Sequence, residues 1–334
     1  MGLRADWIAH VTDRTARAAS IAWRPSIIAP MSHSDLSGQR VLVTGGAGFI
    51  GSHVVEVLLE AGATAIVLDD LSSGTRGNVP AGVELLVADV ADPGVEDVVR
   101  GAHPDIVIHA AAQVSVPVSV ADPGRDREVN VAGTERVLRG ALACGARRFV
   151  FASSGGAVYG EADGADESWL PKPASPYGVH KLAAEGYVSI SGLSFGIARY
   201  ANVYGPRQRS DLEGGVVAIF CERLAAGLPV TIFGSGEQSR DFVFVRDVAE
   251  ATILIATTER SGIWNVSTGQ GTSVNALLDE LSGLTDGPVE VSHEPARPGD
   301  VVVSRLSCEL IRSELGWQPR YSLRPGLVET LQRS

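Results

Sequence analysis

The chain has 334 residues, 45% of them hydrophobic and 20% charged, so it can bury a large core in one domain or in two closely joined ones. Its formal net charge of −11 disfavours nucleic acid and anionic membranes as partners, because the average field of the protein repels both. Three distant cysteines, Cys144, Cys221 and Cys308, have neither the even number of a disulfide framework nor the close spacing of a zinc site, so we expect reduced thiols and no metal.

Residues 1–38 form an extension of different composition, whose first thirty residues hold four arginines and two aspartates before an acidic remainder. We expect it to be poorly ordered or to precede a true start at Met31, with an amphipathic targeting or interaction helix over Val11–Trp23 as the alternative. No signal-peptide pattern opens the sequence, and no apolar run approaches the ~20 residues of a membrane span. These features predict a cytoplasmic protein without a membrane partner.

From Arg40 onward, short β-branched runs alternate with longer amphipathic segments, which is typical of βαβ units around a parallel sheet. The expected strands are Val41–Val43, Ala65–Leu68, Val83–Ala88, Ile106–His109, Phe149–Ala152 and Gly196–Arg199. The expected helices between them are Phe49–Ala61, Val95–Arg100, Arg127–Cys144 and Pro176–Ser191. Six such strands with helices on both faces predict an α/β fold with a doubly wound parallel sheet of the Rossmann type over residues 39–200.

After Tyr200 the segments become shorter and richer in Gly and Pro, which predicts a smaller C-terminal region over residues 201–334, packed on the strand ends. We expect this region to bind mainly the substrate, and part of its chain to return to the sheet. Its expected helices are Val216–Ala226, Val245–Thr257, Ser273–Gly283, Ser307–Leu315 and Leu323–Leu331.

A glycine-rich segment joins the first expected strand to the first expected helix, with Gly45, Gly48 and Gly51 at three-residue intervals. Glycines allow a tight turn and a close backbone approach to a pyrophosphate, while the following helix offers unpaired N–H groups and the positive end of its dipole. The segment therefore predicts a dinucleotide site, to which Phe49 and Ile50 at the start of the helix also belong.

Two carboxylates, Asp69 and Asp70, stand at the end of the second expected strand. A carboxylate there accepts hydrogen bonds from the adenosine ribose and repels a 2′-phosphate, which favours NAD over NADP. At the end of the third expected strand, Asp89 and Val90 are candidates to hold the adenine, with a helix-capping role for Asp89 as the alternative.

The fourth expected strand ends in His109, followed by the small residues Ala110, Ala111 and Ala112, which let the chain pass close beneath the cofactor. We interpret His109 as a packed, hydrogen-bonded core residue. Asn130 is expected to tie the central helix to its neighbours through its side-chain amide, a structural role.

Tyr177 and Lys181 stand four residues apart, hence on one face of a helix that begins near Pro176. A lysine and a nicotinamide ring lower the pKa of a phenol from about 10 toward the range of a general base. Ser153 and Ser154 end the fifth expected strand, and a serine at a strand's carboxyl end points into the ligand crevice. Serine, tyrosine and lysine together predict a proton-transfer site.

With these motifs the sequence resembles the extended short-chain dehydrogenase/reductases, and among them especially the UDP-galactose (UDP-glucose) 4-epimerases. The resemblance extends from about Gln39 to Gln332. Besides the three motifs above it includes Asp69-Asp-Leu-Ser-Ser-Gly74, Arg199-Tyr-Ala-Asn202-Val-Tyr-Gly-Pro206-Arg207, Phe233-Gly-Ser-Gly-Glu-Gln-Ser-Arg240-Asp241-Phe-Val, Arg297-Pro-Gly-Asp300 and Leu315-Gly-Trp317-Gln-Pro319. These motifs are more specific for the family than for epimerases within it.

The resemblance implies a tightly retained NAD that removes hydride from C4 of a UDP-hexose and returns it to the opposite face of a transient 4-ketose. Tyr177 would take the proton of the 4-hydroxyl with help from Ser154, and Lys181 would bind the nicotinamide ribose and stabilise the phenolate. The further positions that the match assigns to the cofactor are Ser73, Gly74 and Tyr200. Those assigned to the substrate are Ser154, Asn202, Arg240, Arg297 and Asp300, with both arginines on the UDP phosphates.

The serine segment departs from many epimerases by an extra glycine before Tyr159. Counting from the strand selects Ser154, whereas counting back from Tyr159 selects Gly155. We take Ser154, because a glycine has no side chain to react, and Ser153 stays open as the alternative.

Two other activities of the same family are alternatives: 4,6-dehydratases commonly have an Asp-Glu pair after the strand-end hydroxyl, and UDP-glucuronate decarboxylases usually have a glutamate in this loop. This chain has Gly155-Gly156 there, which disfavours both. A catalytically silent nucleotide-binding regulator is a third alternative, disfavoured by the intact Ser154, Tyr177 and Lys181.

Two finer expectations also come from the resemblance. The position that limits space beside the sugar's C2 substituent is matched by the small Ser304, which predicts that UDP-N-acetylhexosamines are accepted too. The family's common arrangement predicts a homodimer through the helices near Arg127–Cys144 and Pro176–Ser191.

Overall fold

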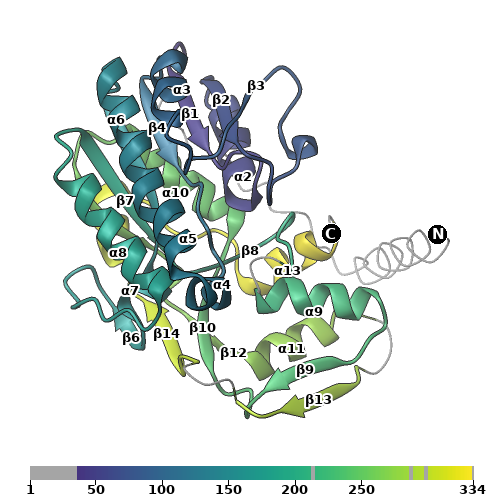
Figure 1. Cartoon of the computed structure of the whole chain (residues 1–334). Coiled ribbons are helices and arrows are strands. Elements are labelled where there is room, and N and C mark those ends of the chain that lie inside the picture. Colours follow the sequence, from purple (N-terminus) through teal and green to yellow (C-terminus); the bar gives the residue numbers. More distant parts are fainter. Residues whose placement is uncertain (1–35, 212–214, 286–288, 297–299, 333–334) are drawn as a thin grey trace.

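The computed structural model describes residues 36–211, 215–285, 289–296 and 300–332. The expected N-terminal extension therefore lies outside the described residues, apart from its last three. Helices cover both faces of a central sheet, and a smaller region of helices and short strands lies below one end of it (Figure 1).

The central sheet consists of parallel strands in the order β11-β7-β5-β4-β1-β2-β3. Their bounds are β1 (Arg40–Thr44), β2 (Thr64–Asp69), β3 (Glu84–Val87), β4 (Ile106–His109), β5 (Arg148–Ser154), β7 (Ser194–Tyr200) and β11 (Gly262–Val266). Successive side chains alternate between the two faces, so that Val41 and Val43 pack on one side and Leu42 on the other. Because both faces are buried, these strands read in the sequence as apolar runs.

One face of the sheet packs against α2 (Phe49–Glu60) and α10 (Val245–Thr257), and the other against α3 (Val95–Ala102), α6 (Thr134–Cys144) and α8 (Pro176–Ser189). The predicted doubly wound α/β fold is thus confirmed. Four of these five helices match the sequence-based bounds within two residues. The stretch expected as Arg127–Cys144 is composite: α5 (Pro123–Arg127) and a π-helical turn η2 (Glu128–Gly133) lead into α6.

The expected count of six strands was wrong by one. β11, from beyond residue 200, pairs in parallel with β7 and extends the sheet at that edge, with Ile263 opposite Ile197. Its sequence Gly-Ile-Trp-Asn-Val is short and includes a buried amide, Asn265, so it has no apolar run by which to recognise it. With α10 it shows that C-terminal segments complete the sheet layer.

The remaining C-terminal segments form the smaller region. Its strands are β8 (Asn202–Tyr204), β9 (Val230–Phe233), β10 (Ser239–Phe244), β12 (Gly271–Ser273), β13 (Val291–Glu294) and β14 (Val303–Leu306), joined by β6 (Ala162–Ala165). Its helices, all expected within two residues, are α9 (Val216–Ala225), α11 (Val274–Ser282), α12 (Glu309–Leu315) and α13 (Leu323–Gln332). These short strands, and the helices α4 (Val116–Ala121) and α7 (Gly155–Tyr159), were not expected. In the described part of the chain no helix combines the length and apolarity that crossing a membrane requires.

Candidate active site

A cleft of about 640 Å³ opens at the carboxyl ends of β1, β2 and β4. β1 lies between β2 and β4, so the chain order reverses there, and α/β sheets bind ligands at such points. The structure brings most of the predicted cofactor residues together in this cleft: Gly45, Gly48, Phe49, Ile50, Gly51, Asp69, Asp70, Ser73, Asp89, Val90, Ala110, Ala111 and Ala112. Four loops that are far apart in the sequence therefore build one cleft.

The glycine-rich loop is packed too tightly to carry side chains at two of its positions. A Cβ at Gly51 would lie 2.1 Å from the carbonyl oxygen of Gly45, and a Cβ at Gly45 would lie 2.7 Å from the amide nitrogen of Ala111. Gly45 also has a φ of +69°, which disfavours other residues. At the start of α2, no side chain among the described residues caps the first turn, so its N–H groups are left to bind an anion.

Asp69 ties the glycine-rich loop to the loop after β2. Its carboxylate accepts hydrogen bonds from the amides of Ala47 (2.9 Å) and Leu71 (2.8 Å). Burial raises its pKa, and these two hydrogen bonds oppose that effect. A carboxylate has about four lone-pair sites, so Asp69 can still accept hydrogen bonds from a ribose. Gly74 lies outside the cleft lining, but a Cβ there would be 2.7 Å from the backbone of Ala47, so it supports the same loop.

Asp89 lines the cleft together with its neighbours Ala88 and Val90. It accepts a hydrogen bond from the amide of Ala91 (2.8 Å) and pairs with Arg125 of α5 (3.0 Å). Burial works against ionisation of Asp89, but these two partners outweigh it and hold its pKa below the ordinary value. The alternative role as a helix cap is not what the structure shows, because Gly94 occupies the N-cap of α3.

Sequence analysis missed a group of cleft residues from the segment after β8. Arg207, Arg209 and Asp211 reach the cleft from the C-terminal side and form part of its wall. Arg209 donates a hydrogen bond to the carbonyl of Ser73 (3.2 Å), and Arg207 donates one to Ser52 on α2 (3.0 Å). The resemblance included Arg207 as the last residue of the Asn202 motif but assigned it no role, and Arg209, two residues later, was not considered. Gln113, Ser115, Val118 and Arg125 also line the cleft without having been predicted.

The predicted tyrosine and lysine lie on α8 and face the protein interior. Tyr177 is 9% exposed, and its amide donates a hydrogen bond to Ser119 of α4, next to the cleft residue Val118. Lys181 is 3% exposed, and its Nζ lies 4.5 Å from the centre of the Phe151 ring. Burial lowers the pKa of Lys181 to about 8, while Glu185 and Asp126 act to raise it. Neither residue lines the cleft: Tyr177 is joined to it through α4, and Lys181 packs on β5.

The two candidate serines point in different directions. Ser153 is buried, and its hydroxyl donates a hydrogen bond to the carboxylate of Glu185 (2.5 Å). Ser154 is half-buried and stands at the N-cap of α7, where its Oγ accepts a long hydrogen bond from the amide of Ala157 (3.4 Å). The structure therefore favours Ser154 as the reacting serine, because the hydroxyl of Ser153 is already engaged by a buried carboxylate.

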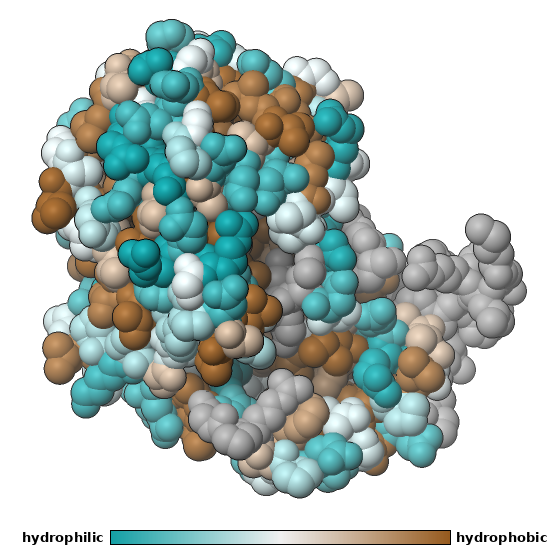
Figure 2. Space-filling model, in the orientation of Figure 1, coloured by the Kyte–Doolittle hydropathy of each residue, from teal (hydrophilic) through white to brown (hydrophobic). Residues whose placement is uncertain are grey.

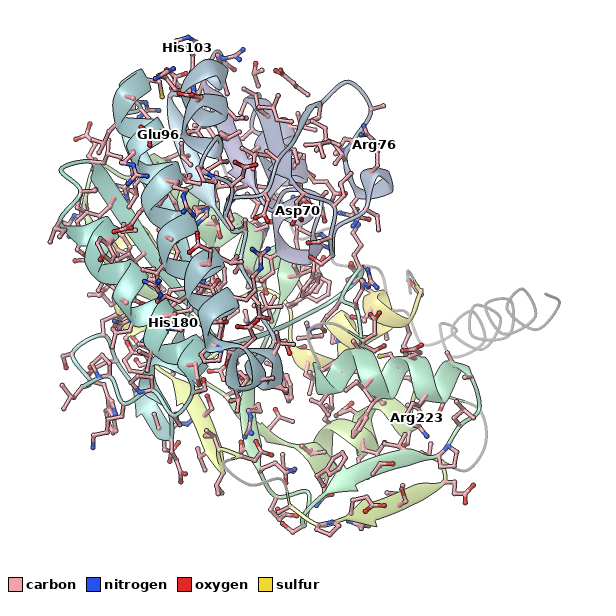
Figure 3. The ribbon with its side chains drawn as sticks, viewed as in Figure 1. Asp70, Arg76, Glu96, His103, His180 and Arg223 are labelled. Carbon is pink, nitrogen blue, oxygen red and sulfur yellow. The ribbon has the colours of Figure 1, made fainter. Side chains whose placement is uncertain are left out.

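Two polar residues have the structural roles that were predicted for them. His109 is buried between the hydroxyls of Thr44 (2.6 Å) and Thr134 (3.0 Å), and burial together with the charge of Lys181 lowers its pKa to about 3. Asn130 lies in the π-helical turn and bonds through its amide to the backbone of Gln113. Figure 3 shows His180 on α8, where its ring bonds to the buried Asp126 of α5 (2.5 Å).

Tyr200 differs from the other predicted cofactor residues. Its side chain packs in the core between the sheet and α10, and its hydroxyl bonds to Thr252 (2.7 Å). Burial raises the pKa of this phenol to about 12, so it is no candidate for proton transfer. A contact between Tyr200 and a cofactor would have to come from its backbone.

The predicted substrate residues gather near α7, at the end of the sheet next to the smaller region. Arg240 of β10 pairs with Asp300 (2.7 Å) and stands opposite Ser304 of β14 in the register. A Cβ at Gly156 would lie 3.2 Å from the Ser304 hydroxyl and 3.9 Å from the amide oxygen of Asn202. Arg297 lies outside the described residues. The described members of the set thus surround the segment that begins with Ser154.

Comparison with known proteins identifies the family. Residues 41–267 match the model of the NAD dependent epimerase/dehydratase family. UDP-glucose 4-epimerase of Mycolicibacterium smegmatis is 41% identical over 305 residues, which cover 88% of this chain and 97% of that protein. The crystal structure of Thermus thermophilus UDP-glucose 4-epimerase in complex with NAD is 45% identical, with a TM-score of 0.84 over 88% of this chain and 98% of that one. The Thermotoga maritima UDP-glucose 4-epimerase with UDP-glucose is 42% identical, with a TM-score of 0.83 over the same shares. This chain therefore belongs to the NAD dependent epimerase/dehydratase family.

Proposed function

We propose that this protein is an NAD-dependent 4-epimerase that interconverts UDP-glucose and UDP-galactose, as an enzyme of galactose metabolism. The observation that carries the proposal is the position of α8: it carries Tyr177 and Lys181 four residues apart and bonds to α4, whose Val118 lines the cleft, while Ser154 ends the strand β5. The similar solved structures with NAD and with UDP-glucose support the same cofactor and substrate class.

The cleft fits NAD on its own geometry. Side chains at Gly45 and Gly51 would collide with the backbone of Ala111 and of the loop itself, so glycines let the loop fold closely against the start of α2, whose first turn has N–H groups for the charge of a pyrophosphate. Asp69 and Asp70 are placed for the adenosine ribose and would repel a 2′-phosphate. When bound, NAD supplies the hydride acceptor for C4 of the sugar and the hydride that returns to the opposite face of the 4-ketose.

The chain's own residues supply the proton chemistry. Tyr177 accepts the proton of the 4-hydroxyl and returns it after the 4-ketose has rotated in the site. Ser154 binds the same oxygen. Lys181 lowers the pKa of Tyr177 through its positive charge. The buried position of both residues on α8 keeps water away from this transfer and strengthens the interaction of their charges.

The UDP part of the substrate would bind at the smaller region. Asn202 and Ser304 lie beside Gly156, and Arg240 stands opposite Ser304 in the strand register. Arg240 is held by Asp300 with its guanidinium largely buried, a position in which a charge-assisted bond to a phosphate is strong. Arg297 is the second arginine proposed for the phosphates.

The structure of α7 argues against the dehydratase and decarboxylase alternatives. A Cβ at Gly155 would lie 2.4 Å from Cδ1 of Leu306, and one at Gly156 would lie 3.2 Å from Ser304. An acidic side chain would require Leu306 to move at the first position and would press on Ser304 at the second. The carboxylates that eliminate water or assist decarboxylation in related enzymes have no counterpart at these two positions.

Three finer features belong to the proposal. The small Ser304 beside Gly156 leaves space at the sugar, which supports use of UDP-N-acetylhexosamines.

Exposed apolar side chains on the neighbouring helices α6 and α8 support a homodimer through this face. They are Leu142, Val179 and Tyr187, with Ile190 at the end of α8. Figure 2 shows hydrophobic residues among hydrophilic ones over the surface that carries these helices. The acidic chain with three free cysteines supports a cytoplasmic location.

The test is to incubate the purified protein with a panel of UDP- and dTDP-sugars without added cofactor and to identify the products by NMR. We expect UDP-glucose and UDP-galactose to interconvert. Tyr177→Phe should lose at least roughly 10²-fold in turnover while still binding NAD, since general acid–base groups contribute about that much. A dehydrated 4-keto sugar or a pentose product would replace the proposal by one of its alternatives. A wild-type protein that binds nucleotide without turnover, and that Tyr177→Phe leaves unchanged, would indicate a regulator.

A further inference from the structure

A buried ion pair that the proposed chemistry does not use joins α8, the helix that carries Tyr177 and Lys181, to β7. Glu185 of α8 and Arg199 of β7 are each 3% exposed, and their side chains bond through Nη2 to Oε2 (2.6 Å) and Nε to Oε1 (3.0 Å). Removing two charges from water is costly, and such a pair is stable only where its geometry and further hydrogen bonds are complete. Because this ion pair has both the geometry and the further hydrogen bonds, we infer that it holds the neighbouring helices and strands in place.

The ion pair joins the segments on both sides of Ser154. Ser153, the residue before it, donates its hydroxyl to Oε1 of Glu185 (2.5 Å). Tyr159, at the end of the helix that Ser154 caps, accepts a hydrogen bond from Arg199 (2.7 Å) and donates one to Asn265 of β11 (3.0 Å). The backbone that carries Ser154 is thus fixed before and after the residue by one ion pair.

The same carboxylate is fixed relative to the tyrosine and lysine. Glu185 comes four residues after Lys181 and eight after Tyr177, so all three lie on one face of α8. Because Ser153 bonds to this carboxylate, the end of β5 is tied to the reactive face of α8 through a side chain and not through backbone pairing.

We propose that Glu185, held by Arg199 and Ser153, is a positioning residue of the 4-epimerase, which sets the place of Ser154 relative to Tyr177 and Lys181. This inference rests on the proposed function. It also assigns the two serines: Ser154 touches the reacting hydroxyl, and Ser153 acts through Glu185.

The carboxylate acts on Lys181 by charge as well as by position. Burial lowers the pKa of Lys181, and Glu185 is the first of the groups that oppose it. The other groups that face Lys181 from the packed elements are Asp126 of α5, bonded to His180, and His109 of β4, which burial keeps neutral. Removing the charge of Glu185 should therefore lower the pKa of Lys181 further.

The closing experiment compares Ser153→Ala with Ser153→Thr and measures kcat, KM for the UDP-sugar, bound NAD and thermal unfolding. Thr330→Ala, which removes a buried hydroxyl from α13, is the control for loss of stability. We expect Ser153→Ala to lose roughly tenfold to a hundredfold in kcat, the effect of misplacing a reacting group by about 1 Å, with KM and bound NAD unchanged. Ser153→Thr keeps the hydroxyl and should recover most of the activity.

Glu185→Gln provides the second readout, the pH profile of kcat. Its alkaline limb should move to lower pH, because Lys181 loses a negative neighbour, whereas Ser153→Ala keeps that charge and should keep the wild-type profile at lower amplitude. Wild-type kcat in Ser153→Ala, or an unmoved alkaline limb in Glu185→Gln, would overturn the positioning role and leave the epimerase in place. A wild-type protein that interconverts no sugar would overturn both the proposed function and this inference.

Discussion

Lys181 combines burial with a charge that the reaction needs. Its ammonium sits against the face of Phe151, and without Glu185 and Asp126 burial would depress its pKa even more. With a pKa of about 8 it remains mostly protonated at neutral pH, where it can favour the phenolate of Tyr177. The charge of Lys181 therefore affects activity, and the burial of the same charge affects the free energy of unfolding.

Lys181→Met should lower kcat by roughly 10²-fold to 10⁴-fold, since in the proposed mechanism Tyr177 would lose the cation that makes it a base. The acidic limb of the pH profile should move upward, because the pKa of the phenol returns toward about 10. Steady-state kinetics between pH 6 and 10 checks both. Lys172→Met, at an exposed lysine, should behave as wild type, and a Lys181→Met enzyme with an unchanged acidic limb would contradict the assigned role.

The contribution of Lys181 to the stability of the cofactor-free protein should rise as the pH increases from about 8 to 10.5. Over this range the unfolded chain still binds the proton of Lys181 whereas the folded protein has released it, so this contribution to the free energy of unfolding increases with pH. Cys221 and Tyr200, whose pKa values burial raises to about 12, contribute in the opposite direction. The full effect is at most about 3 kcal/mol. Urea unfolding of the wild type and of Lys181→Met at pH 7.5 and pH 10 measures this: between the two pH values, the free energy of unfolding of the wild type should increase relative to that of Lys181→Met, in which the other groups titrate alike.

Ser304 gives a prediction about the substrate. A tyrosine at this buried position, beside Gly156, should fill the space next to the sugar. Ser304→Tyr should therefore lose activity on UDP-N-acetylglucosamine by at least roughly tenfold relative to UDP-glucose, as expected for a steric conflict worth more than about 1.4 kcal/mol. The ratio of kcat/KM for the two substrates measures this. Equal losses on both substrate classes would show that Ser304 does not select the sugar.

At the scale of an element, the start of α2 is defined by contacts that leave no space for a side chain. Gly51 packs on the carbonyl of Gly45, and Gly45 in turn packs on the segment after β4. The helix is thereby drawn close to the sheet, and its first turn is directed at the cleft. The loop after β2 reinforces this arrangement, because Asp69 and Gly74 both contact Ala47.

Gly51→Ala should displace the first turn of α2 and weaken NAD binding, because the new methyl would lie 2.1 Å from a backbone oxygen. We expect a loss of at least roughly 2 kcal/mol in stability, the usual result of overpacking. Isothermal titration with NAD and thermal unfolding are the measurements. The matched control is Gly101→Ala in α3, where no described atom lies within 4 Å of the added Cβ and the helix should gain up to about 1 kcal/mol. Normal NAD affinity in Gly51→Ala would disprove the packing argument.

At the scale of the whole molecule, α6 and α8 present apolar side chains to solvent while their other faces cover the sheet. Leu142 is 45% exposed and Ile190 is 81% exposed. Isolated exposed apolar residues need no explanation, but several on two adjacent helices indicate a contact surface. The proposed dimer would place these helices against their copies and leave the cleft of each protomer accessible.

The double variant Leu142→Asp/Ile190→Asp should be a monomer, because dimerisation would bury two added charges in each protomer. Light scattering after size-exclusion chromatography gives the mass. Leu228→Asp, at a 50% exposed leucine between α9 and β9, should remain a dimer. A monomeric wild type, or a double variant that still dimerises at micromolar concentration, would show that this face is not a dimer interface.

Much of the central sheet and part of the site could be predicted from the sequence, because their signals are local. Each helix of the sheet layers has an apolar face that repeats every three to four residues, and α10 was predicted with the bounds that the structure shows. The glycine spacing and the four-residue interval between Tyr177 and Lys181 are equally local. Such features depend on neighbours along the chain and need no knowledge of what packs against them.

The tertiary structure decided the rest, because those features depend on residues that are distant in the sequence. The pairing of β11 with β7, the bond from Arg209 to Ser73 and the ion pair between Glu185 and Arg199 join segments that have no common pattern. The choice between Ser153 and Ser154 belongs here too: adjacent residues of a strand point to opposite faces, and what each face contains is known only when the chain has folded.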